Sequence, residues 1–186
     1  DLLPFEEAKL YGHNSVHALL GSLARLRGCT AMSQVRRDQT LFSLGRQALL
    51  AESGAALIAT HGRTGDPLFT EPGFKDYSDD LLRRITNPFL HDKVDRIIRD
   101  PLRKLGWSDR FFGTMRLTLR QGITPECMAL GAAATALYAM EAEKGSGGSP
   151  RELLLRLWGS EPAAAERDRC LSLMEKAMPR LSDWRS

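Results

Sequence analysis

The chain has 186 residues, of which 42% are apolar and 26% are charged, and its formal net charge is +3. This length and composition are ordinary for one soluble globular domain with a sizeable core. No segment approaches the ~18 uninterrupted apolar residues of a membrane span, so no membrane contact is expected. The acidic N-terminus, DLLPFEEAKL, also lacks the basic region of a signal peptide.

The cysteines point to a reducing compartment. Cys29, Cys127 and Cys170 are odd in number and widely spaced, which fits neither a disulfide framework nor a zinc site. We therefore expect a cytoplasmic protein without a bound metal. The chain begins at Asp1 rather than at Met, which suggests that it is a piece of something longer.

Helical periodicity runs through almost the whole chain. A first helix opens near Pro4 and stops at Gly28. Amphipathic patterns then predict helices over 40–60, 78–85, 89–98, 109–122 and 124–144, and two more after the flexible connection GSGGS at 145–149. The stretch 61–77, rich in Gly and Pro, is expected to be a loop. Since no run of alternating β-branched residues occurs, we predict an all-α fold, with 1–186 as a single domain.

Polar residues beside prolines or acids indicate where several helices begin. Ser78 is predicted to cap a helix whose first turn is acidic. Asn87 precedes Pro88, and Thr124 precedes another proline, in the arrangement typical of helix starts.

The sequence lacks the pattern of a nucleotide-binding fold. No strand precedes a G-x-G-x-x-G fingerprint, and GSGGSP breaks that spacing between two helices. No P-loop, G-x-S-x-G or H-E-x-x-H motif occurs either. If the protein uses a nucleotide cofactor, the part that binds the nucleotide is therefore elsewhere.

A polar stripe marks the first helix. At about 100° per residue, Glu6, Lys9, His13, Asn14 and His17 fall within an arc of roughly 140°. All five can transfer a proton or hydrogen-bond an oxygen. The simplest interpretation is a solvent face, but two histidines and an asparagine are poor helix formers for such a face.

If this stripe were a solvent face, Leu2, Leu3 and Leu10 would point at the core. The alternative is chemical. Oxidation of an alcohol by hydride transfer needs a base for the hydroxyl proton, and a desolvated lysine can serve. An amide and an imidazole aimed at the same oxygen would stabilise its developing charge, and a nearby carboxylate could pass the proton to solvent.

Positive charge is concentrated in residues 83–120. This segment holds ten Lys/Arg and four Asp, a balance of +6 that leaves −3 for the rest of the chain. Two explanations of this positive charge are equally good: a solvated, salt-bridged pair of helices, or an anion site. For an anion site, phosphate or a nucleotide would be the usual ligand.

Two motifs resemble those of a known family. Glu6, Lys9, Asn14 and His17 reproduce the pattern E-x-x-K-x-x-x-x-N-x-x-H of the zinc-independent long-chain polyol dehydrogenases. The stretch RRITNPFLHDKVDRIIRDPLRKL at 83–105 resembles the segment typical of the mannitol-1-phosphate 5-dehydrogenase branch, and Asp109-Arg110 follows as in that branch. Together the motifs span about the first 110 residues.

The resemblance implies the C-terminal part of a two-domain enzyme. In that family an N-terminal Rossmann-type domain binds NAD(P), and an all-helical C-terminal domain supplies most of the groups that contact the polyol. This chain would be that helical domain, with the Rossmann domain as its partner, and would be inactive alone. The reaction implied is the interconversion of mannitol 1-phosphate and fructose 6-phosphate. Free mannitol or a hexuronate (fructuronate or tagaturonate) is the alternative substrate.

The resemblance also assigns residues. Lys9 would be the acid/base, Asn14 and His17 would hold the reacting oxygen, and Glu6 would connect Lys9 to solvent. Arg84 and Asn87 would contact substrate hydroxyls or shape the site, although Asn87 could equally be only a helix cap. The candidates for a substrate phosphate are Arg99, Arg103 and Lys104.

Two other classes compete with an enzyme. The basic segment could belong to a nucleic-acid-binding module, but Phe89, Trp107, Phe111 and Phe112 have the spacing of core residues rather than of stacking platforms. The small residues of LGAAATALYAM could form a dimerisation helix, yet they fit a buried core helix more simply.

Overall fold

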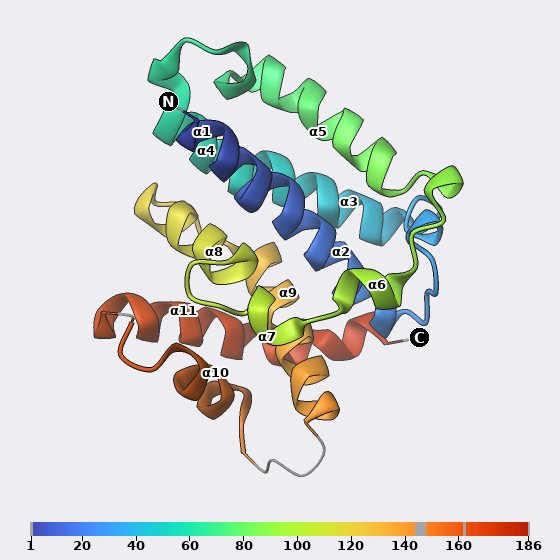
Figure 1. Ribbon diagram of the computed structural model, residues 1–186, viewed down its shortest axis with the longest axis vertical. Coiled ribbons are helices and arrows are strands. Elements are labelled where there is room, and N and C mark those ends of the chain that lie inside the picture. Colours follow the sequence, from blue (N-terminus) through green and yellow to red (C-terminus); the bar gives the residue numbers. More distant parts are fainter. Residues whose placement is uncertain (1, 144–147, 162, 186) are drawn as a thin grey trace.

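The computed structural model describes residues 2–143, 148–161 and 163–185, and this part of the chain is helical with no β-strand (Figure 1). The all-α prediction is therefore confirmed. The α-helices are α1 (Leu3–Glu7), α2 (Ser15–Leu26), α3 (Gln39–Gln47), α4 (Ala55–His61), α5 (Glu71–Ile85), α6 (Val94–Ile98), α7 (Pro101–Lys104), α8 (Arg110–Arg120), α9 (Glu126–Ala142), α10 (Pro150–Trp158) and α11 (Ala164–Ala177). No helix in these ranges is long and apolar enough to cross a membrane.

Short segments of other helix types join these elements. Two are π-helices, η1 (Ala8–Asn14) and η3 (Ala48–Gly54). The 3₁₀ turns are η2 (Met32–Gln34), η4 (Gly62–Thr64), η5 (Pro67–Phe69), η6 (Pro88–Leu90) and η7 (Met178–Trp184).

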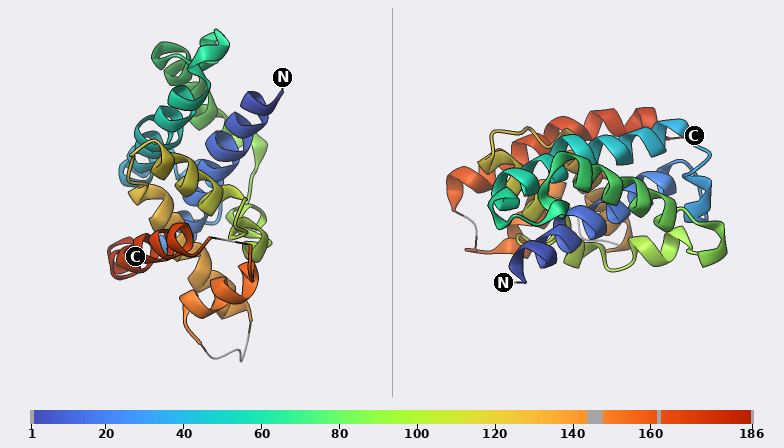
Figure 2. Two further views of the ribbon diagram at one scale, coloured as in Figure 1. Left: turned by 90° about the vertical axis from the view of Figure 1, so that its left-hand side faces the viewer. Right: turned by 90° about the horizontal axis from the view of Figure 1, so that it is seen from above.

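The apolar helix α9 forms the centre of the fold. It packs against α2, α8 and α11, and Figures 1 and 2 show α3 to α5 at one end of the molecule and α10 and α11 at the other. A Cβ at Gly131 would lie 2.6 Å from the ring of Phe111 and 2.8 Å from Leu19, so glycine permits this close approach. Ser22 of α2 and Thr135 of α9 share a buried hydrogen bond of 2.8 Å between their hydroxyls. The small residues of α9 thus line a core, as their spacing suggested.

A carboxylate from η3 caps α9. The backbone N–H groups of Cys127 and Met128 donate to the two oxygens of Glu52, at 2.6 and 3.1 Å. Burial raises the pKa of Glu52, whose side chain has almost no exposure. The prediction that Thr124 caps this helix is wrong. Pro125 is the residue that precedes α9, its side chain cannot cap the helix, and Glu52 accepts from the free N–H groups instead.

The polar stripe lies on a wider helix than the sequence suggested. Residues 8–14 and 48–54 are π-helical and pack against each other, in the middle of otherwise α-helical runs. The wheel of about 100° per residue is therefore only approximate there. π-Helical turns of this kind are frequent at functional sites.

The prediction of a loop over 61–77 is wrong for residues 71–77, which form the beginning of α5. Thr70 caps this helix by accepting a hydrogen bond from the N–H of Gly73 at 3.2 Å, and Pro72 lies in the first turn, where proline is tolerated. Ser78 is therefore not a cap. It is buried inside α5, where its hydroxyl donates to the Phe74 carbonyl at 2.7 Å.

The segment after α5 is less helical than predicted. Asn87 caps only the short turn η6, by accepting from the N–H of Phe89 at 3.0 Å. His91 then adopts φ 50°, which ends the turn, so a helix resumes only at Val94. Of the predicted connection 145–149, residues 145–147 lie outside the described ranges, and Ser149 begins α10 in a reciprocal cap with Glu152.

Replacing the buried cap should destabilise the fold. Glu52→Ala leaves two buried N–H groups without an acceptor, so we expect the free energy of unfolding to fall by about 2–4 kcal/mol. Chemical denaturation measures the loss. Glu126→Ala, an exposed change in the same first turn of α9, is the matched control and should cost less than about 0.5 kcal/mol. Equal losses in the two variants would contradict the capping role.

Candidate active site

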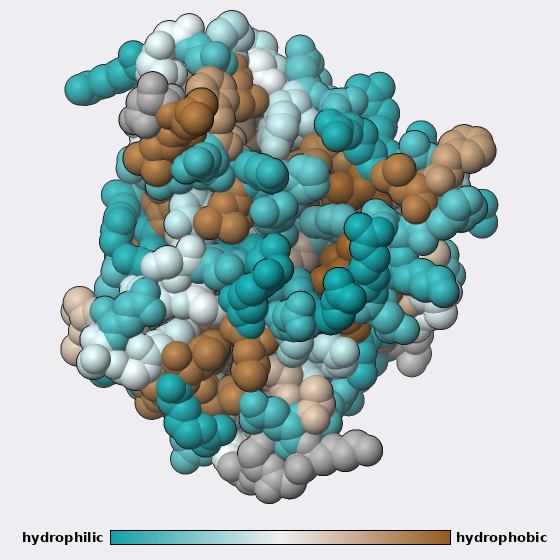
Figure 3. All heavy atoms as spheres, in the orientation of Figure 1, coloured by the Kyte–Doolittle hydropathy of each residue, from teal (hydrophilic) through white to brown (hydrophobic). Residues whose placement is uncertain are grey.

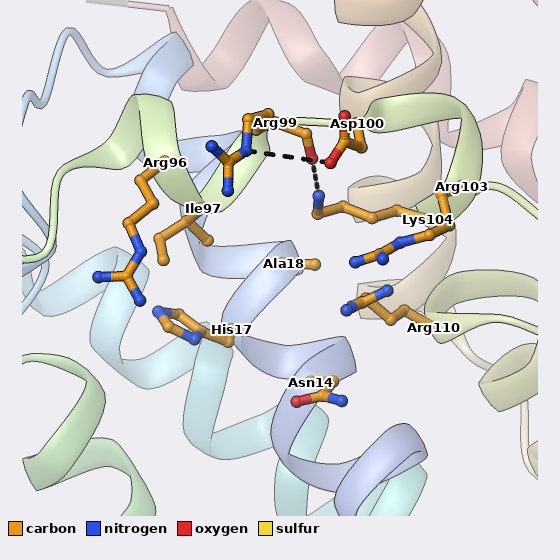
Figure 4. Close-up of a pocket in the computed structure, with 10 residues that line it drawn as sticks. All are labelled: Asn14, His17, Ala18, Arg96, Ile97, Arg99, Asp100, Arg103, Lys104 and Arg110. Atoms are coloured by element: carbon orange, nitrogen blue, oxygen red, sulfur yellow. Dashed lines mark hydrogen bonds and ion pairs between the residues drawn. The ribbon is translucent and has the colours of Figure 1, made fainter.

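A cavity of about 220 Å³ opens between α2, the α6–α7 segment and the start of α8. Its wall carries five Lys/Arg side chains and one carboxylate (Figure 4). We call it the anion pocket, and it is lined by Asn14, His17, Ala18, Arg96, Ile97, Arg99, Asp100, Arg103, Lys104 and Arg110. Such a surplus of positive charge in a hollow favours an anionic ligand.

Three parts of the chain deliver these groups. Asn14 ends η1 and His17 lies in the first turn of α2, so both project from the helix that packs on α9. Lys104 comes from the end of α7. Arg110 is the first residue of α8, where Asp109 accepts from its backbone N–H at 2.7 Å and pairs with its guanidinium at 2.7 Å.

His17 contributes a neutral imidazole. Burial lowers its pKa to about 4, with smaller contributions from His13, Arg96 and Arg110. Its Nε2 atom is buried without a hydrogen-bond partner in the described part of the chain. Because buried polar atoms are nearly always hydrogen-bonded, this nitrogen is suited to a polar ligand atom.

Lys104 is a buried cation. Its side chain is only 6% exposed, and its ammonium donates to the Arg99 carbonyl. Burial, with Arg110 and Arg103 nearby, lowers the pKa of Lys104 to about 8. The ammonium is therefore largely present at neutral pH but is lost a little above it, and a bound anion would stabilise it.

The polar stripe continues from the pocket toward the N-terminus. The rings of His13 and His17 lie with centroids 6.1 Å apart. Burial lowers the pKa of His13, and the positive charges of Arg84 and Lys9 lower it further. Arg84 of α5 is thus close to the stripe, although it does not line the pocket. Lys9 and Glu6 are exposed to solvent in this chain.

The interpretation of the stripe as a plain solvent face is not supported by its apolar neighbours. Of the three leucines that this alternative places in the core, Leu2 and Leu3 are 72% and 51% exposed, and Leu10 is half-buried. Phe5 is also 42% exposed. The N-terminal helix therefore presents apolar side chains to solvent alongside the polar stripe. Exposed apolar side chains that lie together are typical of a surface that contacts another domain or protein.

The structure brings together some predicted site residues and not others. Arg99, Arg103 and Lys104 share one pocket with Asn14 and His17, as a common site requires. Arg84 lies 3.7 Å from Asp80 on α5, with its side chain 70% exposed. Asn87 acts as a helix cap, the alternative that the sequence left open, and lies outside the pocket.

Sequence reasoning did not select two cations of the pocket. Arg96 and Arg110 were counted in the basic segment only, and they reach the pocket from different helices. Arg96 is mostly exposed and pairs with Asp92 at 2.8 Å, whereas Arg110 is largely buried. The only sequence signal for them was that they lie in the basic segment, because it is the packing of α6 and α8 beside α2 that brings them close to His17.

No cluster of three or more potential metal ligands occurs among the residues that the structure describes. The three cysteines are free, with Cys127 and Cys170 buried.

The chain belongs to the mannitol dehydrogenase family, as its C-terminal domain, since the model of that domain matches residues 1–166. It is similar to mannitol-1-phosphate 5-dehydrogenases of Halalkalibacterium halodurans (31% identity over 78% of this chain and 37% of the relative) and Caldanaerobacter subterraneus subsp. tengcongensis (33% over 74% and 34%). A third, from Brevibacillus brevis, is 32% identical over 74% and 34%. The chain thus spans about a third of the length of these relatives.

Anion binding should depend on the protonation of Lys104. Sulfate keeps its charge between pH 6 and 9, so its affinity should be constant below about pH 8 and fall as pH rises through the pKa of Lys104. Lys104→Met should weaken sulfate binding roughly tenfold at pH 6.5 and remove this pH dependence. Calorimetric titration measures both. Lys93→Met, an exposed change outside the pocket, is the control, and an identical pH profile in Lys104→Met would refute the assignment.

Proposed function

We propose that this chain is the substrate-binding and proton-transfer domain of a zinc-independent, NAD(P)-dependent polyol dehydrogenase. The reaction proposed is the interconversion of mannitol 1-phosphate and fructose 6-phosphate. The observation that carries the proposal is the anion pocket. It adjoins Asn14 and His17, on the same continuous helix as Lys9, in a chain of the mannitol dehydrogenase family.

Lys9 is the proposed acid/base. In polyol oxidation its neutral amine takes the hydroxyl proton as the C–H hydride leaves, and in ketose reduction its ammonium returns that proton. The Asn14 amide and the neutral His17 imidazole hydrogen-bond the reacting oxygen and stabilise its developing charge. Glu6, one turn before Lys9 and exposed, passes the proton to solvent.

The hydride acceptor would be NAD(P), which supplies the redox chemistry when bound. The described residues form no strand and therefore no Rossmann-type site of their own, so we assign the dinucleotide to a preceding domain of the same protein. That domain would cover the Lys9 end of the stripe. In support, Leu2, Leu3 and Phe5 are exposed, and Figure 3 shows hydrophobic residues gathered around the N-terminal helix. In this proposal residues 1–186 are one helical domain, separate from the domain that binds the dinucleotide.

The substrate is proposed to be a phosphate ester. A phosphate carries close to two negative charges at neutral pH and presents several acceptor oxygens, which matches Arg103, Lys104 and Arg110 around one cavity. Free mannitol would leave these cations without a counter-charge. A hexuronate carries a single negative charge and is the alternative substrate. Arg84, near His13, would contact substrate hydroxyls at the other end of the stripe.

The non-catalytic alternatives have less support. Phe111 and Phe112 are fully buried and Trp107 nearly so, which leaves these three unable to stack on nucleic-acid bases. The expectation that Phe89 is a core residue is wrong, because it lies in the short turn η6 with 85% of its surface exposed. The small residues of α9 are enclosed by α2, α8 and α11, so they are not a free dimerisation surface.

The substrate experiment uses the full-length protein. NAD-dependent oxidation of mannitol 1-phosphate, mannitol and the reduced hexuronates is compared, with and without a chelator. We expect chelator-insensitive oxidation of the phosphate ester, and none by residues 1–186 alone. Activity on mannitol alone, or on a reduced hexuronate alone, would overturn the substrate assignment.

The acid/base role makes a second prediction. Lys9→Ala in the full-length protein should lower kcat by about 10³- to 10⁴-fold and leave the affinity for NAD nearly intact. Steady-state kinetics and cofactor titration measure the two effects. Lys75→Ala, an exposed change on α5, is the control. A loss of only tenfold would mean that another group moves the proton.

A further inference from the structure

Asp100 has an unusual backbone conformation at the edge of the anion pocket. Its φ and ψ are 55° and 58°, and His91 is the only other non-glycine residue with positive φ in the ranges that the structure describes. This left-handed region is costly for residues with a side chain, and Asp and Asn tolerate it better than most. Strained backbone of this kind clusters at functional sites.

The turn at Asp100 determines where the preceding carbonyl points. It separates α6 from α7, and the Arg99 carbonyl accepts a hydrogen bond from the Lys104 ammonium, as the dashed line in Figure 4 shows. Lys104 is buried, and within the described residues its ammonium has no other hydrogen-bond acceptor. The ammonium thus keeps N–H groups available at the pocket wall.

A neighbouring hollow holds Glu143, which follows α9, beside Asp100 and Arg103, and the pocket itself places further charged and titratable groups near Lys104. On its own segment these are Arg99, Asp100 and Arg103; α8 adds Asp109 and Arg110, α2 adds His17, and α6 adds Arg96. Arg110 and Arg103 oppose the charge on Lys104, whereas Asp100 and Asp109 favour it. Without the carboxylates, a buried lysine among arginines would tend to lose its proton.

A carboxylate on the wall of an anion pocket repels the ligand directly. Asp100 is 63% exposed and lies 3.9 Å from the Arg99 guanidinium, so its contribution to stability is that of a weak surface pair. Asp109 differs, because it also caps α8. The presence of Asp100 is therefore better explained by an indirect benefit.

We propose that Asp100 is a positioning residue of the anion pocket: its left-handed turn holds the Arg99 carbonyl on the Lys104 ammonium, and its carboxylate offsets the positive charge that Arg103 and Arg110 place around that ammonium. The ligand is taken to be the substrate phosphate, so in that respect the inference rests on the proposed function. The two contributions, backbone and charge, can be separated.

Three variants make the separation. Asp100→Asn removes the charge and keeps a residue that tolerates positive φ, Asp100→Gly removes the charge and relaxes the turn, and Asp100→Ala removes the charge and penalises the turn. The titration of Lys104 is followed by NMR of isotopically labelled lysine without ligand. KM and kcat for mannitol 1-phosphate are measured on the full-length protein at pH 6.5 and 8.5.

In Asp100→Asn and Asp100→Gly we expect the pKa of Lys104 to fall by about 0.5. At pH 8.5 the KM of these variants should then be about threefold higher than that of the parent protein. At pH 6.5 their KM should be no higher than the parent value, and kcat should be unchanged at both pH values. Asp100→Ala should raise KM severalfold above Asp100→Gly at both pH values. His91→Ala imposes the same backbone penalty away from the pocket and should change neither readout.

An unchanged pKa of Lys104 in Asp100→Asn would overturn the charge role, and equal KM values in Asp100→Ala and Asp100→Gly would overturn the backbone role. If the parent protein does not oxidise mannitol 1-phosphate, the proposed function fails. The ligand-free titration of Lys104 still decides whether Asp100 keeps it charged.

Discussion

The packing of α2 against α9 determines where the polar groups of the site can lie. One side of α2 is buried on α9 through Leu19 and the hydrogen bond between Ser22 and Thr135. The same helix projects His17 into the anion pocket, and it continues N-terminally through η1 to Asn14 and Lys9. Because close-packed interiors transmit displacement, a shift of α9 would move the pocket wall as well.

The pocket concentrates positive charge. Cations converge from α6, α7 and α8, burial keeps His17 neutral, and burial also lowers the pKa of Lys104. Local pairs such as Arg110 with Asp109 offset part of this repulsion. An anion would offset the rest, and it would bring a polar atom to the buried Nε2 of His17. These features are the ones on which the proposed phosphate site rests.

The helices with strong apolar periodicity could be predicted from the sequence, because that periodicity reflects the face each one buries. The start of α5 could not, since Gly73 and Pro72 act as loop signals unless Thr70 is recognised as a cap. The capping of α9 by Glu52 was equally hidden, because the two lie far apart in the sequence.

The same division holds for the site. Asn14 and His17 lie on one helix, so helical spacing alone placed them together. Arg99, Arg103 and Lys104 were selected from a local motif, and in the structure they line one pocket together with these two residues of that helix. Arg110 joins them only through the packing of α8, which no local pattern encodes.

The most direct test is a crystal structure of the full-length protein with mannitol 1-phosphate and the oxidised cofactor. We predict that the phosphate lies in the anion pocket, within hydrogen-bonding distance of Lys104, Arg103 and Arg110. A substrate hydroxyl should donate a hydrogen bond to the Lys9 amine. A phosphate bound beside Arg84, or a substrate without contact to Lys9, would contradict it.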